Sequence, residues 1–123
     1  MPISLEFRRD NIAWMIGRDP CSIEVRRPGR TADDAETTFT FTGRVAPAGS
    51  VGGTGTSVPL EIRGENGATR YASVLVAPWN TPDIKYMDEL IVTHAASGIV
   101  RYFRVAEPRH LAWKWEVMLE ERT

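Results

Sequence analysis

The sequence predicts a mainly β protein: a small antiparallel barrel or sandwich of about seven strands with one short N-terminal α-helix. Three observations predict this fold class. Apolar and polar residues alternate with a period of two in most segments after Cys21, whereas helical spacing occurs only near the N-terminus. Turn residues recur at short intervals, in RPGRTADDAE, GENG, PWNTPD and AASG. Helices and strands do not alternate, so a parallel sheet is not expected.

The helix is expected over residues 8–18. Asp10 is the predicted N-cap, and Gly17 followed by Pro20 ends the segment. The apolar residues at helical spacing are Ile12, Met15 and Ile16. A helix of about three turns is marginal alone in water, so we expect it to dock on the sheet.

Four segments show the alternation typical of strands with one buried face. They are CSIEVRR (21–27), TTFTFTGRV (37–45), SVPLEIR (57–63) and AWKWEVMLEE (112–121). Their predicted inward residues are Ile23, Val25, Phe39, Phe41, Val45, Val58, Leu60, Ile62, Trp113, Trp115, Val117 and Leu119. ELIVTH is a further, shorter strand candidate.

Two other segments, RYASVLVAP and IVRYFRVA, carry apolar residues on both faces. Examples are Val74 to Val76 in the first, and Val100, Tyr102 and Phe103 in the second. Such strands are usually covered on both sides. We therefore expect the N-terminal helix, or a neighbouring subunit, to cover one of them.

Length and composition indicate one domain over residues 1–123, with the barrel over about 21–121. The net charge of −1 argues against bulk electrostatic binding to nucleic acid or to a membrane. The basic residues are thirteen arginines and two lysines, which fits either base composition or use at interfaces. The single cysteine, Cys21, excludes an internal disulfide and is expected to be a buried small apolar group. No signal peptide or membrane span is expected.

The uncharged stretch APAGSVGGTGTSVP, residues 46–59, is expected to be a flexible loop between two strands. It lacks the lysine and the following helix of a phosphate-binding loop, and the strand pattern on both sides argues against a domain linker. A loop of this length is either functional or idle, and composition alone does not decide between them.

No catalytic or metal-binding pattern stands out, so we expect a protein that is not an enzyme and that uses no metal or cofactor. His94 and His110 have no partner at ligand spacing, and the acidic run around Asp33 and Asp34 fits a solvated turn. Trp79 lies in a predicted turn, where it either contacts a partner or folds back over the core.

Two long segments, YASVLVAPWNTPDIKYMDELIVT and GIVRYFRVAEPRHLAWKWEVMLEE, follow a short helix, the strand IEVRRP and the glycine-rich loop. This order resembles the head-closure or head–tail joining (stopper or connector) proteins of long-tailed bacteriophages, over roughly residues 7–121. That family usually has glycine before the aspartate that corresponds to Asp88, in IKYMDELIV, and this chain has Met87 there.

The resemblance implies a β-barrel subunit of a homo-oligomeric ring at the virion neck, assembled in the host cytoplasm. It implies a portal or adaptor protein on the head side, a tail terminator or tail tube protein on the tail side, and no membrane. Packaged double-stranded DNA would pass through the channel without sequence-specific contact. The channel loop would hold Val51, Gly52, Gly53, Thr54 and Gly55, as a plug for that DNA.

Ring assembly directs attention to charged residues and to the turn tryptophan as interface candidates. They are Arg26, Arg63, Arg101, Trp79, Asp33, Asp34, Glu120 and Glu121, with arginines of one copy expected to meet acidic residues of the next. Two alternatives stay open. One is a tail-side connector or tail terminator, and the other is a small β-barrel that binds peptide or single-stranded nucleic acid, with Trp113, Lys114 and Trp115 as its nearest candidate site.

Overall fold

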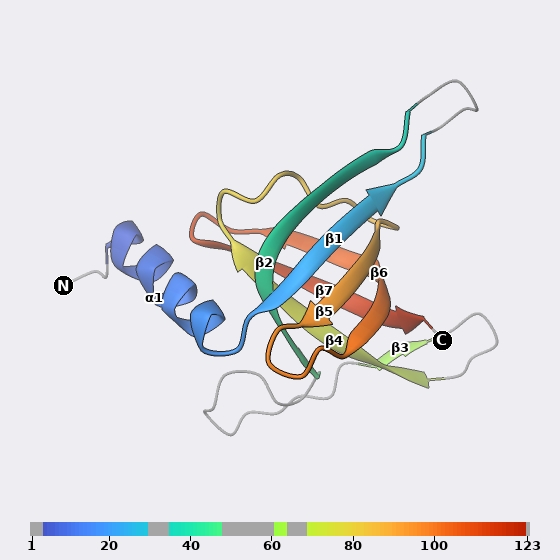
Figure 1. Cartoon of the computed structure of the whole chain (residues 1–123). Coiled ribbons are helices and arrows are strands. Elements are labelled where there is room, and N and C mark those ends of the chain that lie inside the picture. Colours follow the sequence, from blue (N-terminus) through green and yellow to red (C-terminus); the bar gives the residue numbers. More distant parts are fainter. Residues whose placement is uncertain (1–3, 30–34, 48–60, 64–68, 123) are drawn as a thin grey trace.

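The computed structural model describes residues 4–29, 35–47, 61–63 and 69–122, and it confirms a mainly β fold: a closed antiparallel barrel with one N-terminal helix (Figure 1). The elements are α1 (Leu5–Arg18), β1 (Cys21–Arg27), β2 (Thr37–Pro47), β3 (Glu61–Arg63), β4 (Thr69–Pro78), β5 (Glu89–His94), β6 (Val100–His110) and β7 (Lys114–Arg122).

Six strands close the barrel, in the order β1, β5, β6, β7, β4 and β2, with β2 returning to β1. All neighbouring pairs are antiparallel. The strand β3 pairs with β4 outside this ring of strands. The expected count of about seven strands is therefore slightly off for the barrel itself. The expected inward residues Val58 and Leu60 lie outside the described part of the chain.

The barrel interior holds the residues that the period of two assigned to it. Ile23 and Val25 of β1 are fully buried, as are Val117 and Leu119 of β7. Phe39, Phe41 and Val45 of β2 are partly buried and pack against this core. Apolar burial of this kind is the main stabilising contribution in a domain of this size.

The helix begins earlier than expected, and the predicted N-cap is wrong. Ser4 is the N-cap, because its backbone is extended and its Oγ accepts a hydrogen bond from the N–H of Phe7 at 3.1 Å. Asp10 lies exposed inside the helix. Leu5 and Phe7 open the helix, but four polar residues, 8–11, follow them, so the apolar spacing typical of a helix starts only at Ile12.

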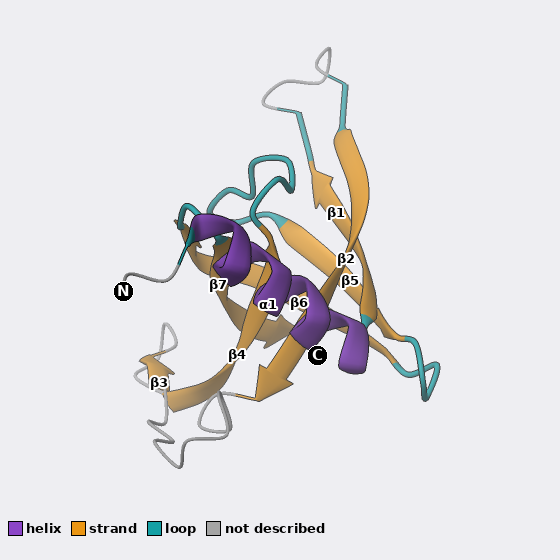
Figure 2. Cartoon of the chain, turned by 90° about the vertical axis from the view of Figure 1, so that its left-hand side faces the viewer, coloured by secondary structure: helices purple, strands orange, loops and turns teal. Residues whose placement is uncertain are grey.

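The helix α1 packs on the outside of β4 and β2 (Figure 2). Ile16 is its buried residue, and the guanidinium of Arg44 in β2 donates to the carbonyl of Met15 at 3.3 Å. Val76, on the outer face of β4, is buried as well. The expectation that the helix covers one of the two strands with apolar residues on both faces is confirmed for β4.

The C-terminal strand places only one of its two expected tryptophans in the core. Trp115 is buried, and its indole N–H donates to the carbonyl of Thr81 at 3.2 Å. Trp113 lies before the strand, in the turn closed by the N–H of Leu111 and the carbonyl of Lys114, and the Arg8 guanidinium stacks on its ring. The inward assignment of Trp113 is wrong, because the turn takes that residue out of the alternation.

The strand β6 continues past its expected end at residue 106. Its pairing with β7 shifts by one residue between Val105 and Glu107, which is a β-bulge. Pro108 follows this irregularity, where a residue without an N–H is tolerated in a strand. The bulge lets β6 extend to His110 while Phe103 and Val105 stay in the core.

Candidate interaction surface

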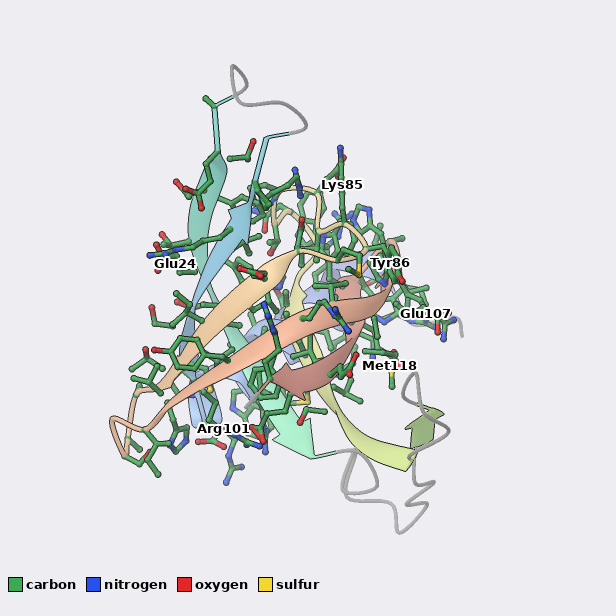
Figure 3. All side chains as sticks on the ribbon, turned by 90° about the vertical axis from the view of Figure 1, so that its right-hand side faces the viewer. Glu24, Lys85, Tyr86, Arg101, Glu107 and Met118 are labelled. Carbon is green, nitrogen blue, oxygen red and sulfur yellow. The ribbon has the colours of Figure 1, made fainter. Side chains whose placement is uncertain are left out.

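The outer face of strands β5 and β6 exposes apolar side chains. Because residues alternate along a strand, Leu90, Val92 and Phe103 fill the barrel while Ile91, Val100 and Tyr102 point outward. Val100 is 46% exposed and Tyr102 is 55% exposed. We call the patch made of Ile91, Val100 and Tyr102 the β5–β6 face; its two strands lie in front in Figure 3.

The residues of the β5–β6 face lie close together because of the strand register. Ile91 is directly opposite Tyr102, and Thr93 is opposite Val100. Directly opposed side chains on one face of an antiparallel pair have Cβ atoms about 5 Å apart, so the patch is continuous. Ile99, just before β6, adds a further exposed apolar side chain.

The helix cannot cover this face. It packs on β4 and β2, and in the circular strand order β4 lies opposite β5 and β2 lies opposite β6. Figures 2 and 3 view the molecule from opposite sides, with α1 in front in one and β5 and β6 in front in the other. Within the described ranges, the second strand with apolar residues on both faces therefore stays open to solvent.

A shallow pocket of about 380 Å³ is sunk into the β5–β6 face. It is lined by Arg26, Glu89, Leu90, Ile91, Tyr102, Phe103 and Arg122. Leu90 and Phe103 are almost fully buried in the barrel, so the accessible side chains of the lining are those of Ile91, Tyr102 and the charged residues. Ile91, Tyr102 and the two guanidinium groups suit an aromatic side chain.

A row of alternating charge borders the pocket. Arg26 is opposite Glu89, Glu89 is opposite Arg104, and Arg104 is opposite Glu120 on four neighbouring strands. The Arg104–Glu120 pair is 2.9 Å long, and Arg122 pairs with Glu89. Because these charges neutralise one another within the chain, covering the surface would leave few charges unpaired.

The loop that leads into β5 is held by a nearly buried ion pair. The Asp88 carboxylate is 2% exposed and accepts hydrogen bonds from Arg27 Nε at 2.8 Å and Arg27 Nη2 at 2.7 Å. It also accepts from the Lys85 N–H at 2.8 Å, and Arg27 donates to the Asp83 carbonyl at 2.9 Å. The hydrogen bonds to Asp88 raise the pKa of Arg27, against the opposing effect of burial.

Met87 takes the conformation that glycine would take. Its φ is +73°, in the left-handed region, at the third position of a turn closed by the Asp88 N–H and the Lys85 carbonyl. The Met87 N–H donates to the Val105 carbonyl at 3.0 Å, and the Val105 N–H donates to the Asp88 carbonyl at 2.9 Å. The tight turn thus forms without glycine, because ladder bonds and the ion pair hold it.

The opposite end of β5 is connected to the end of the helix. His94 Nε2 lies 2.5 Å from Asp19 Oδ1, and His94 Nδ1 lies 2.7 Å from Ser97 Oγ. The hydrogen bond with His94 is the main cause of a lowered pKa for Asp19. Gly98 has a φ of +74° in the turn that follows, a conformation that glycine adopts readily. These contacts fix the β5–β6 turn relative to α1.

Several predicted interface residues find partners within the chain. Arg26 lies 3.5 Å from Glu24 on its own strand. Arg101 pairs with Glu121, whose hydrogen bond raises the pKa of Arg101. Glu120 pairs with Arg104. The predicted contacts between copies at these residues would therefore have to compete with bonds inside each copy.

The other candidates are placed as follows. Trp79 is covered on one side by the Arg9 guanidinium, 3.6 Å from the ring centroid, and its carbonyl accepts a hydrogen bond from His110 at 2.9 Å. Arg63 lies in β3, and its side chain is outside the described part. The turn residues Asp33 and Asp34 also lie outside it, as does the channel loop of Val51, Gly52, Gly53, Thr54 and Gly55.

The remaining reactive side chains are held in structural contacts. Cys21 is buried, as expected, and burial raises the pKa of its thiol. His110 stacks on Trp115 with 4.2 Å between ring centroids. Among residues 4–29, 35–47, 61–63 and 69–122, no three His, Cys, Asp or Glu side chains gather as metal ligands would. Within the same ranges, α1 is neither long nor apolar enough to span a bilayer.

Sequence reasoning selected charged residues for the interface and missed the apolar ones. The signal is present in the sequence, since IVRYFRVA carries apolar residues on both faces. What was missing was the register that brings Ile91 beside Tyr102 and that pairs the charges within the chain.

Comparison with known proteins adds no relative: no family model, no curated protein and no solved structure matches this chain.

Proposed function

We propose that this chain is a structural subunit of a homo-oligomeric ring at a phage-like head–tail junction, where it closes the head after DNA packaging and joins it to the tail. The observation that carries the proposal is the exposed apolar β5–β6 face. Of the two strands with apolar residues on both faces, β4 is covered by α1, whereas β6 belongs to this exposed face. The head-side partner would be a portal or adaptor, and the tail-side partner a tail terminator or tail tube protein.

Exposure of the β5–β6 face to water costs free energy that a partner covering it would recover. Burying apolar surface contributes about 25 cal/mol per Å², and a large aromatic such as Tyr102 offers much of that surface in one residue. Aromatic side chains that border a pocket are also the usual centres of binding energy in interfaces. A partner that covers this face would gain apolar contacts and meet a row of charges that is already neutralised.

The resemblance of residues 7–121 to head-closure proteins supports the kind of assembly. Two of its segments, around IKYMDELIV and GIVRYFRV, are the ones that build the β5–β6 face. The part of the resemblance that stood out as a departure, Met87, does not prevent the turn.

Electron microscopy of lysates tests the proposal, after deletion of the gene from the phage genome or particle cluster that encodes the chain. We expect separated tails and heads that have lost their DNA, and restoration of whole particles by the wild-type gene. The variant Tyr102→Arg should fail to restore them. Glu107→Arg is the matched control, because Glu107 is exposed on the same strand beyond the bulge. Intact tailed particles from the deletion strain would contradict the proposed head-closure role.

The same experiment separates the tail-side alternative. Heads that keep their DNA but lack tails would assign the chain to a tail-side connector or terminator.

A further inference from the structure

The helix carries a second exposed apolar surface. Phe7 is 54% exposed and Trp14 is 62% exposed. Residues seven apart lie on the same side of a helix, about 10 Å from each other along its axis. Asp10 lies between them on this stripe, and it forms no ion pair with any residue that the structure describes. We call the stripe of Phe7, Asp10 and Trp14 the α1 ridge.

The α1 ridge and the β5–β6 face lie on opposite sides of the barrel. The helix packs on β4 and β2 through Ile16, and these strands lie across the barrel from β5 and β6. Figures 2 and 3 show the two sides in turn. The two surfaces therefore cannot meet within one chain, although they can meet between two copies.

The chemistry of the two surfaces is complementary. The pocket on the β5–β6 face has Tyr102 and Ile91 at its walls and the guanidinium groups of Arg26 and Arg122 at its border. An indole ring is the aromatic group that guanidinium groups attract most strongly. Both arginines pair within their own chain, Arg26 with Glu24 and Arg122 with Glu89, but the pocket lining holds two guanidinium groups and one carboxylate. The carboxylate of Asp10, next to that ring on the α1 ridge, would offset the excess positive charge of this lining.

We propose that the β5–β6 face of one copy binds the α1 ridge of a second copy, with Trp14 seated in the pocket beside Tyr102. The choice of a second copy as the occupant rests on the proposed function. The Arg18 guanidinium, 4.9 Å from the Trp14 ring centroid, orients the indole within its own chain. Trp14 stays 62% exposed despite this contact, so its indole is accessible to a partner.

The contact is heterologous, because different surfaces of the two copies meet. Each pair of copies then keeps one free α1 ridge and one free β5–β6 face, so association continues, into a ring if the rotation between neighbours closes and into an open filament if it does not. Surfaces on opposite sides of a subunit favour an assembly of many copies over a closed dimer, and the head-closure role requires that this assembly be a ring.

Complementary variants test this contact in solution. Trp14→Ala removes the indole of the α1 ridge, and Tyr102→Ala removes a wall of the pocket. Both residues are more than half exposed, so the fold should tolerate each change. In sedimentation velocity at protein concentrations up to about millimolar, wild-type chain should form a series of oligomers, and each variant alone should associate about 30-fold more weakly. A 1:1 mixture of the two variants should stop at a dimer, because each supplies one intact surface.

Cysteine cross-linking locates the contact directly. In a Cys21→Ala background, Trp14→Cys combined with Tyr102→Cys should give a ladder of disulfide-linked oligomers under mild oxidation. The control pair, Trp14→Cys with Glu107→Cys, should not give the ladder, since Glu107 lies outside the patch.

Three results would overturn the inference: no association of the wild type at millimolar concentration, equal ladders from the control pair, or dimers linked only through Trp14→Cys on both copies. The last would show a symmetric helix–helix contact instead. These outcomes are independent of the particle phenotype. A disulfide ladder together with intact tailed particles from the deletion strain would support the contact and reject the head-closure role. Separated heads and tails from the deletion strain without a disulfide ladder would support the role and reject the contact.

Discussion

Removal of the Asp88 carboxylate should destabilise the chain by detaching the loop that leads into β5. Asp88→Ala deletes three hydrogen bonds, two from Arg27 and one from the Lys85 N–H. It also leaves the Arg27 guanidinium without its carboxylate at the start of β5. The loop that ends in Met87 would lose its main anchor.

The magnitude follows from the burial of the pair. Removing one partner of a buried ion pair costs about 3–5 kcal/mol. The Arg27 side chain is 25% exposed, so water can reach its charge, and we expect a loss near the lower limit, about 3 kcal/mol. For a chain of this length that loss corresponds to a fall of roughly 10 °C in Tm.

Urea denaturation of Asp88→Ala, Arg27→Ala and the double variant is the assay. The double variant should lose about 2 kcal/mol less than the sum of the single variants, because the two side chains act as a unit. A loss below about 1 kcal/mol for Asp88→Ala, or strict additivity, would refute the claim that this pair anchors the loop.

Three further predictions concern backbone geometry and pH. Met87 has a left-handed φ, which costs a residue with a side chain about 1–2 kcal/mol. Met87→Gly should therefore be about 0.5–1 kcal/mol more stable than Met87→Ala in urea titrations. Equal stability of the two variants would contradict the strain. Gly43→Ala should lose about 1–3 kcal/mol of unfolding free energy, because its Cβ would lie 2.9 Å from a backbone carbonyl oxygen. Gly17→Ala is the matched control: a Cβ there meets open space, so this variant should gain about 0.5 kcal/mol. Unchanged stability of Gly43→Ala would contradict the steric argument. The pKa of Asp19 is lowered, so its bond with His94 stabilises the fold above the ordinary carboxyl pKa of 3.8, and this stability is lost as pH falls through the folded value. The Tm difference between wild type and Asp19→Asn should therefore shrink below pH 3.8. A Tm difference that stays constant with pH would contradict this stabilising role.

The inward residues could be predicted from the sequence because the side-chain period of a strand is two. Ile23 and Val25 are the clearest instance, and the helix docks through Ile16 as its spacing indicated. The N-cap could not be predicted in this way, because the polar residues 8–11 separate Leu5 and Phe7 from the apolar spacing that begins at Ile12. Trp113 failed for a similar reason, since the closing hydrogen bond of its turn depends on which strands pair.

The candidate surface depended on information that is not local in the sequence. That β6 has two apolar faces was predictable, but the identity of the strand that α1 covers follows from the closure of β4 with β2. The pairing of Arg104 with Glu120, and of Arg101 with Glu121, follows from the β6–β7 register. Without that register, exposed arginines were the natural candidates for contacts between copies.

A cryo-electron microscopy map of the neck of a particle whose genome encodes this chain is the most direct test of the proposed ring. We predict a ring at the head–tail junction in which the β5–β6 face of every copy is covered by the neighbouring copy, with Tyr102 in the contact. A neck without this chain, or a ring in which Tyr102 faces solvent, would contradict it.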